Sequence, residues 1–168
     1  MRPLIIILAL VLISACQQGK STHQEHKNLA EQLLRSVYVG DTARINDMVS
    51  DDIVSTYPVF SQLFGTSALR GREAYEKFAM GFSERWNDAK IIFQEAIAED
   101  TSVVLVWSFS ATRMTTTPDS SFVAGREYSW GGITLFHFNE SGKITAEIGE
   151  ESSPGPIGRL KPNLNSQQ

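Results

Sequence analysis

The period of the hydrophobic pattern changes near Asn87 and Asp88, and this change constrains the fold more than any other feature. Before it, apolar residues recur every three or four positions, which is typical of amphipathic helices. After it come segments rich in Val, Trp, Phe and Thr, which is typical of strands. Helices followed by strands indicate an α+β domain whose helices lie on one face of a sheet.

Periodicity and chain breakers divide the first part into five expected segments: helix 24–39, helix 42–50, extended segment 53–57, loop 58–69 and helix 72–86. Leu29, Leu33 and Val37 fall on one face of the first helix, and Gly40 is expected to end it. Asp41 is then expected to cap the second helix. Three helices and one short extended segment are therefore predicted before the sheet.

Four strands are expected after the change of period, over residues 89–98, 102–115, 126–138 and 143–151. The segments between them are short and rich in turn-forming residues, so three hairpin-type connections predict an antiparallel meander. Gly131 and Gly132 interrupt the third strand, and we expect them to mark a bulge that bends the sheet.

Composition excludes several classes of protein. The chain has 168 residues and a formal charge of −4, from 15 Lys and Arg against 19 Asp and Glu. This length suits one domain, and the charge makes nucleic acid an unexpected partner. A single cysteine excludes an internal disulfide and a zinc site built on cysteines. No phosphate-binding loop or metal motif is present, so we expect no metal and no cofactor.

The N-terminal segment has the pattern of a secretory signal peptide. Arg2 precedes an apolar run over residues 4–13, and two small residues follow it before Cys16. The run is too short to span a bilayer. We therefore expect four parts: signal peptide 1–15, a tether over 16–23, a domain over 24–152 and a tail over 153–168.

The four residues up to Cys16 (Ile13, Ser14, Ala15 and the cysteine itself) resemble the lipobox of bacterial lipoproteins. This resemblance implies that Cys16 carries acyl chains and becomes the mature N-terminus, which anchors the chain in a membrane. Gln17 follows the cysteine where an aspartate would retain a lipoprotein at the inner membrane. The resemblance therefore implies the outer membrane of the cell envelope, with the domain facing the periplasm.

Short motifs spread over residues 29–160 resemble the SnoaL-like polyketide cyclase and ester cyclase family of the nuclear transport factor 2-like superfamily. They are Gly40-Asp41, Asp51-Asp52-Ile53, the segment 69–74, Gly125-Arg126 and Gly142-Lys143-Ile144. The resemblance implies a cone-shaped fold in which three N-terminal helices pack on a curved antiparallel sheet. It also implies a pocket between helices and sheet, and often a homodimer formed through the sheet.

Aromatic side chains are the expected lining of that pocket. The candidates for binding an apolar small molecule are Tyr38, Tyr57, Trp86, Trp107, Tyr128 and Trp130. Rings supply apolar surface, and phenol hydroxyls orient a ligand. For each of them, ordinary core packing is the alternative.

Carboxylates in the last strand are the candidates for acid–base chemistry. Alternation from Ile144 predicts that Ile148 and Glu150 point inward, while Glu147 and Glu151 point outward. An inward carboxylate in an apolar cone has a raised pKa, which suits proton transfer. In the family that the chain resembles, a catalytic aspartate lies near the end of this strand, and the matching position here is Ser152, which is not an acid. Glu150 and Glu151 are the catalytic candidates that could substitute for it through parity or a small register shift.

The remaining polar candidates are expected to have structural roles. His23 and His26 are expected to be solvated, and His137 to be hydrogen-bonded within its strand. Arg70 and Arg72 are expected to be surface charges. Two functions stay open: a cofactor-independent cyclase or isomerase, and a non-catalytic lipoprotein that binds a small molecule or a protein.

Substitution of the acylated residue tests the expected anchor. The change Cys16→Ala removes the thiol that would carry the lipid, so the protein should leave the membrane fraction and change its gel mobility. Fractionation of cells followed by electrophoresis measures both effects. Sedimentation of the variant with membranes, as for the parent, would contradict the prediction.

Overall fold

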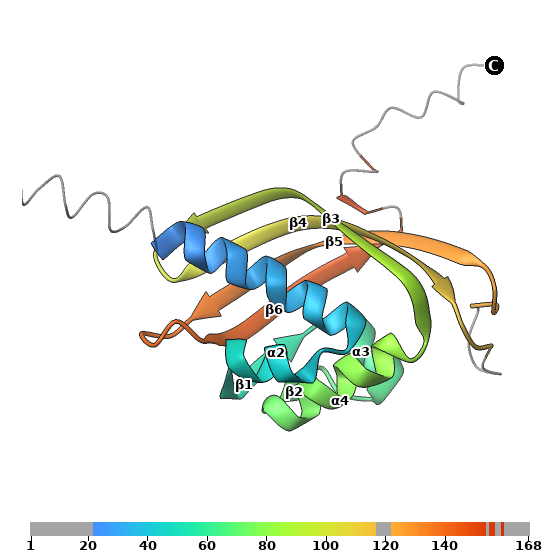
Figure 1. Cartoon of the computed structure of the whole chain (residues 1–168), viewed down its shortest axis with the longest axis horizontal. Coiled ribbons are helices and arrows are strands. Elements are labelled where there is room, and N and C mark those ends of the chain that lie inside the picture. The colour runs from blue at the N-terminus through green and yellow to red at the C-terminus, as the bar shows by residue number, and fades with distance from the viewer. Residues whose placement is uncertain (1–21, 117–121, 154, 157–158, 160–168) are drawn as a thin grey trace, which may run out of the picture.

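The structure is a computed structural model that describes residues 22–116, 122–153, 155–156 and 159 (Figure 1). The expected signal peptide and Cys16 lie outside the described residues, as does most of the expected tail. Among the described residues, no helix is long and apolar enough to cross a membrane. The expected domain boundaries remain predictions.

The described chain forms an N-terminal helix followed by α2 to α4 and β1 to β6. In chain order the bounds are 22–39 for the N-terminal helix, then α2 Thr42–Met48, β1 Val49–Thr56, α3 Pro58–Phe64, β2 Leu69–Arg70, α4 Arg72–Ser83, β3 Trp86–Glu99, β4 Ser102–Arg113, β5 Glu127–Phe138 and β6 Ile144–Ser152. The expected helices and the four long strands are present, with ends shifted by a few residues.

The segment expected to be a loop, 58–69, instead contains α3 and the start of β2. Pro58 occupies the first turn of α3, where its missing N–H costs nothing. Gly65 adopts the left-handed conformation at the other end of the helix. The expectation of a loop is therefore wrong, because the proline begins a helix at this position.

The six strands form one sheet in the order β2-β1-β6-β5-β4-β3. Strands β3 to β6 pair antiparallel in sequence, which confirms the meander. Strand β1 pairs parallel with β6, so the sheet is mixed rather than purely antiparallel. The α+β class with N-terminal helices on a curved sheet is confirmed.

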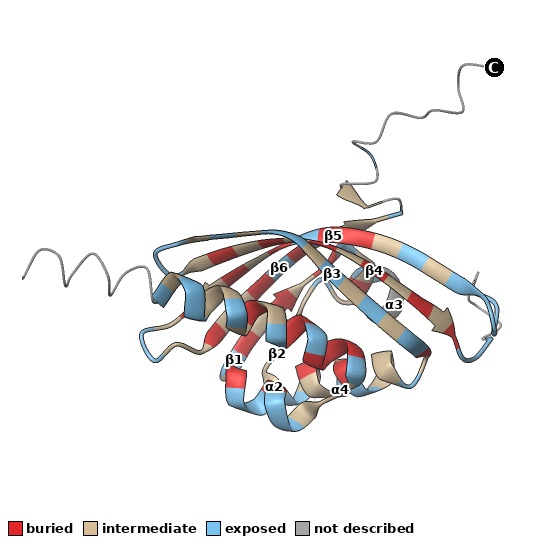
Figure 2. Cartoon of the chain, turned by 45° about the horizontal axis from the view of Figure 1, so that its top comes forward, coloured by how far each residue is buried: buried red, intermediate tan, exposed pale blue. Residues whose placement is uncertain are grey.

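The helices cover one face of the sheet, and the N-terminal helix runs along the strands (Figure 1). Its buried stripe includes Ala30, Leu33 and Val37, which are at most 3% exposed. Buried and less buried residues alternate along β4, from Val103 to Arg113 (Figure 2). The core therefore lies in the space enclosed by the helices and the sheet.

A register shift changes the alternation in β6. Phe138 pairs with Ile144, but His137 pairs with Ala146, so Thr145 is an extra residue in this strand. An extra residue moves every later side chain to the opposite face of the sheet. Ile148 is accordingly 48% exposed, against the expectation from simple alternation.

Gly131 and Gly132 do not form a bulge, because β4 and β5 pair through them without a shift. They permit close packing instead. A Cβ atom on Gly132 would lie 2.5 Å from the carbonyl oxygen of Glu150 and 2.6 Å from the Trp107 ring. The expectation of a bulge is wrong, and the glycines make room for Trp107.

Two glycine substitutions should have opposite effects on stability. Gly132→Ala should lower the free energy of unfolding by about 1–3 kcal/mol, because the methyl group meets backbone and a packed indole. Gly81→Ala, within α4 and with nothing within 4 Å, should raise it by about 0.5–1 kcal/mol. Urea unfolding of both variants measures the difference. Equal effects of the two substitutions would contradict this account of the packing.

Candidate functional site

The inner face of β6 carries two carboxylates with a glycine between them. Glu147, Gly149 and Glu151 point toward the helices, and Glu147 is only 2% exposed. Glu150 is exposed, whereas the carboxyl group of Glu151 is mostly buried. The predicted orientations of these residues are therefore wrong, because the extra residue in β6 reverses the alternation.

Glu147 accepts hydrogen bonds at both carboxylate oxygens. The Ser55 hydroxyl donates to Oε2 at 2.8 Å, and the Tyr57 hydroxyl donates to Oε1 at 2.8 Å. Ser55 and Glu147 are paired residues of β1 and β6, and Tyr57 follows directly after β1. The parallel pairing of these two strands therefore positions both donors.

A chain of hydrogen bonds continues from Tyr57 into the sheet. Trp107 Nε1 donates to Thr134 Oγ1 at 2.9 Å, and Thr134 Oγ1 lies 3.1 Å from the Tyr57 hydroxyl. Since Tyr57 donates its proton to Glu147, the Thr134 hydroxyl donates to Tyr57. All donors then point toward Glu147, an arrangement in which each bond strengthens the next.

Gly149 lets the ring of Tyr57 lie directly on β6. A Cβ atom at this position would lie 1.9 Å from the ring carbon Cε1 of Tyr57. Only a residue without a side chain fits here. The phenol consequently lies above the strand between the two inward carboxylates and reaches Glu147 with its hydroxyl.

Tyr75 on α4 is a second phenol near the same carboxylate. It is 1% exposed, and its hydroxyl is buried without a partner in hydrogen-bond geometry among the described residues. Its attraction to Glu147 nevertheless lowers the pKa of that carboxyl group. The Tyr75 hydroxyl is therefore a buried donor that a small movement would bring into the network.

The pKa of Glu147 is raised from its usual range. Burial is the main cause, because it disfavours the charged form. The interactions with Tyr75, Ser55 and Tyr57 oppose this rise by stabilising the carboxylate. Glu147 thus combines strong burial with the donors that an ionised carboxylate requires.

Glu151 has fewer compensating contacts, and its pKa is raised to about 7. Burial is again the main cause, and repulsion from Glu147 adds to it. A hydrogen bond from Trp130 acts in the opposite direction. A carboxyl group that titrates near neutral pH is suited to both accepting and releasing a proton.

Tyr38 lies in the electric field of both carboxylates. Its pKa is raised well above the usual value by burial, by Glu151 and by Glu147, in that order. The phenol therefore keeps its proton at neutral pH and can act only as a hydrogen-bond donor toward an anion. Its ring packs on Phe109 at a centroid distance of 4.3 Å.

The six aromatic candidates for ligand binding fall into two groups. Tyr38, Tyr57, Trp107 and Trp130 surround the carboxylates, whereas Trp86 and Tyr128 pack at 5.9 Å from each other near the end of β4. The groups are joined, because the ring of Trp86 lies 5.2 Å from that of Trp130. Their role in binding remains a prediction.

Glu150 lines a different feature on the other side of Tyr57. An open hollow of about 210 Å³ is bordered by Thr56, Tyr57, Pro58, Ser61, Ser67, Ile148, Gly149 and Glu150. Tyr57 belongs both to the lining of this hollow and to the Glu147 network, whereas Glu147 itself is not part of the lining. Glu150 therefore belongs to the outer surface of the sheet.

The other polar candidates mostly have structural partners. His137 Nδ1 lies 3.0 Å from the Ser102 hydroxyl, and Arg72 forms an ion pair with Asp51. His26 is not solvated as expected, because its ring stacks on Phe138 at 4.1 Å. Arg70 is exposed. Within the described ranges, no three His, Cys, Asp or Glu side chains gather as metal ligands would.

Sequence reasoning missed Glu147, Ser55, Thr134 and Tyr75 as site residues. Alternation counted from Ile144 assigns Glu147 to the outer face, and the helical stripe assigns Tyr75 to ordinary core. The available signal was the sequence Glu147-Ile148-Gly149-Glu150-Glu151, in which acids occur on both faces and a glycine interrupts them. That pattern does not show which residue of the strand is the extra one, and so it does not show which acids point inward.

The raised pKa of Glu151 predicts a pH-dependent loss of stability. The folded state holds a proton that the unfolded state releases between pH 4.5 and about 7, so stability falls as pH rises through this window. Glu151→Gln should therefore be more stable than the parent above pH 7, by about 3 kcal/mol at most, and equal to it below pH 4.5.

Urea unfolding at pH 4.5 and pH 8 measures this difference. The matched control is Glu150→Gln, since this residue is exposed on the same strand and should show no such pH-dependent gain. A Glu151→Gln variant with the same stability difference at both pH values would exclude the raised pKa.

Known proteins resemble the chain in sequence pattern and in fold. The model of the SnoaL-like domain matches residues 30–147. No curated protein has a significant sequence match to the chain. Solved structures do match in fold, and three of them illustrate the range of activities described for this architecture.

The first is IdmH from Streptomyces antibioticus, a candidate polyketide cyclase, with a TM-score of 0.65, 13% identity and coverage of 80% of this chain and 97% of that one. The second is an LEH-like epoxide hydrolase from M. tuberculosis, with a TM-score of 0.58, 14% identity and coverage of 78% and 85%. The third is SalBIII, an epoxide hydrolase/cyclase-like enzyme of pyran ring formation in salinomycin, with a TM-score of 0.59, 17% identity and coverage of 77% and 92%.

These structural similarities show the fold alone, because the sequence identities are between 13% and 17%. The family match covers most of the described domain, including β1, α4 and the β6 residues up to Glu147. The chain therefore belongs to the SnoaL-like domain family and has the nuclear transport factor 2-like fold.

Proposed function

We propose that this chain is a cofactor-independent acid–base enzyme of the cyclase or isomerase type that acts on an apolar small molecule. The observation that carries the proposal is Glu151, a mostly buried carboxyl group with a pKa of about 7 beside a second buried carboxylate. A group with this pKa takes up and returns protons at neutral pH without a metal or a cofactor. The solved structures of similar fold include a candidate polyketide cyclase and an epoxide hydrolase/cyclase-like enzyme.

In the proposed reaction, ionised Glu151 removes a proton from a carbon next to a carbonyl group. The C–H electron pair forms the enolate double bond, negative charge moves to the carbonyl oxygen, and Glu151 becomes neutral. Tyr38 keeps its proton and donates a hydrogen bond to this oxygen. The neutral Glu151 then returns the proton at the position that completes isomerisation or ring closure.

Glu147 has a positioning role in this proposal. Its two hydrogen bonds hold it in place, and its charge is the second cause of the raised pKa of Glu151. Proton transfer to Glu147 itself would break the interactions that hold Tyr57. Glu147, the more deeply buried carboxylate, therefore raises the pKa of Glu151.

The alternative is a non-catalytic binding protein. The observation in its favour is the open hollow of about 210 Å³ beside Tyr57, which mixes apolar Ile148 with the polar groups of Ser61, Ser67 and Glu150. Glu151 is not among the residues that line this hollow. Binding without turnover is the result expected from this alternative.

We also propose that the domain is held at the outer membrane through acylated Cys16 and faces the periplasm, as the lipobox-like sequence suggests. We further propose that the domain forms a homodimer through the outer face of the sheet. It is supported by one apolar row across four strands, formed by the paired residues Ile97, Val104, Leu135 and Ile148. Ile97 and Ile148 are 59% and 48% exposed.

A probe reaction tests the base without knowledge of the natural substrate. Nitrobenzisoxazole is flat and apolar, and a carboxylate that removes its acidic ring proton breaks the N–O bond and releases a coloured cyano-nitrophenolate. The rate should rise with pH and level off above about pH 7 as Glu151 ionises. Glu151→Gln should lower it about 100-fold or more, the usual contribution of a general base.

Glu150→Gln is the matched control, because it makes the same chemical change on the opposite face of the same strand. It should retain the rate and the pH profile of the parent. Equal losses in both variants, or a rate independent of Glu151, would exclude the proposed base and favour the binding protein.

A further inference from the structure

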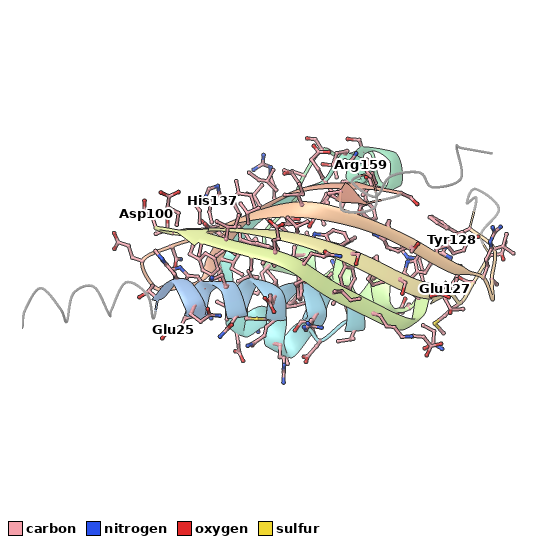
Figure 3. The ribbon with its side chains drawn as sticks, turned by 90° about the horizontal axis from the view of Figure 1, so that it is seen from above. Glu25, Asp100, Glu127, Tyr128, His137 and Arg159 are labelled. Atoms are coloured by element: carbon pink, nitrogen blue, oxygen red, sulfur yellow. The ribbon has the colours of Figure 1, made fainter. Side chains whose placement is uncertain are left out.

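Two arginines meet at the end of the sheet where β3 begins and β4 ends. Arg113 is the last residue of β4 and pairs with Trp86, the first residue of β3. Arg85 directly precedes β3, and its carbonyl oxygen accepts a hydrogen bond from the N–H of Met114 at 2.9 Å. Figure 3 shows Tyr128 at this end of the sheet and His137 toward the other end.

The guanidinium group of Arg113 is held against aromatic rings. Arg113 is 5% exposed. Its Cζ atom lies 5.0 Å from the centroid of the Trp86 ring and 5.6 Å from the centroid of the Phe122 ring. Nε donates to the carbonyl oxygen of Thr115 at 2.7 Å. This fixes the plane of the group, and no hydrogen bond from its two terminal nitrogens, Nη1 and Nη2, is found among the described residues.

Arg85 lies close enough to Arg113 for the two charges to repel each other. Burial, followed by this repulsion, lowers the pKa of Arg85, and Glu84 opposes the change. The Nε atom of Arg85 is buried and has no hydrogen-bond partner among the described residues. A donor of this kind is costly to bury unless an acceptor reaches it.

Within the described part of the chain neither arginine forms an ion pair, and Glu84 is the one carboxylate whose charge is among the causes of the Arg85 pKa. The ion pairs there involve Arg44, Arg72 and Lys77, all on the helices. Two neighbouring cations that are partly buried and unpaired destabilise the fold when nothing binds to them. An anion that reached the buried Nε of Arg85 would supply the acceptor that this atom lacks among the described residues.

We propose that Arg85 and Arg113 form a binding site for an organic carboxylate with a flat, unsaturated body. A guanidinium group presents two parallel N–H donors that match the two oxygens of a carboxylate. The Trp86, Phe122 and Tyr128 rings beside the arginines supply the surface for the flat body. The site is distinct from Glu151 and does not require that Glu151 perform chemistry.

Binding of naphthoate to the purified full-length protein tests the site. Titration calorimetry, with tryptophan fluorescence as a second readout of Trp86, gives the affinity. Naphthamide is the neutral analogue and should bind at least about tenfold more weakly, because it lacks the charge that the arginines recognise. Inorganic phosphate should compete poorly, because it lacks the flat body.

Arg85→Met should lower the affinity for naphthoate about tenfold or more without lowering the melting temperature, since it removes repulsion between two cations. Arg113→Met risks the fold because Arg113 is buried. Arg113→Lys is therefore the second variant, which retains the charge but not the paired donors, and it should also weaken binding. Arg70→Met, an exposed arginine on β2, is the matched control and should bind as the parent does.

Two results would overturn the site: equal binding of naphthoate and naphthamide, or a normal affinity in Arg85→Met. If the melting temperature of Arg85→Met also fell while its affinity was normal, Arg85 would serve the fold instead. Loss of nitrobenzisoxazole turnover in Glu151→Gln with normal naphthoate binding would separate this site from the proposed base.

Discussion

The buried carboxylate of Glu147 is the interaction on which the arrangement of the sheet depends. It joins β6 to β1 through Ser55 and, through Tyr57 and Thr134, to β5 and the Trp107 indole of β4. Ser55 and Glu147 are 92 residues apart in sequence. Strands β1 and β6 pair in parallel without a hairpin to set their register, so this polar contact distinguishes the correct register from a shifted one.

A buried charge is by itself weak evidence for stability, since desolvation offsets much of what its partners contribute. The Glu147 network instead specifies one structure. Any shift of β6 by one residue would place Glu147 outside and leave the donors Ser55 and Tyr57 without their acceptor. Gly149 also specifies this register, because the Tyr57 ring fits only over a position that lacks a side chain.

The order of the elements other than α3 and β2 could be predicted from the sequence, because hydrophobic period depends on local geometry alone. Leu29, Leu33 and Val37 mark the N-terminal helix correctly, and the strands after Asp88 follow from their composition. The parallel pairing of β1 with β6 could not be predicted, because it depends on contacts between distant residues. The same holds for the extra residue at Thr145.

That one residue accounts for most of what was wrong about the site. Alternation predicted correctly that a carboxylate near the end of β6 enters the interior. It selected Glu150, because a count from Ile144 cannot detect a residue that the partner strand leaves unpaired. Tyr57 and Trp107 were identified as aromatic candidates, but the polar contacts that they make depend on Thr134 and Glu147 in other strands.

Groups of opposite charge lie at the two ends of the aromatic interior. Glu151 and the Arg85–Arg113 pair have opposite signs, yet no arginine is among the causes of the Glu151 pKa. The Trp130 and Trp86 rings, with centroids 5.2 Å apart, lie between them, because Trp130 contacts Glu151 and Trp86 contacts Arg113.

Direct pairing with an arginine would lower the pKa of Glu151 below its value of about 7. The tryptophans therefore separate the carboxyl group from the guanidinium group. A molecule with an anionic end and an apolar body would meet both ends at once, with its charge held by the arginines and its body directed along the rings toward Glu151.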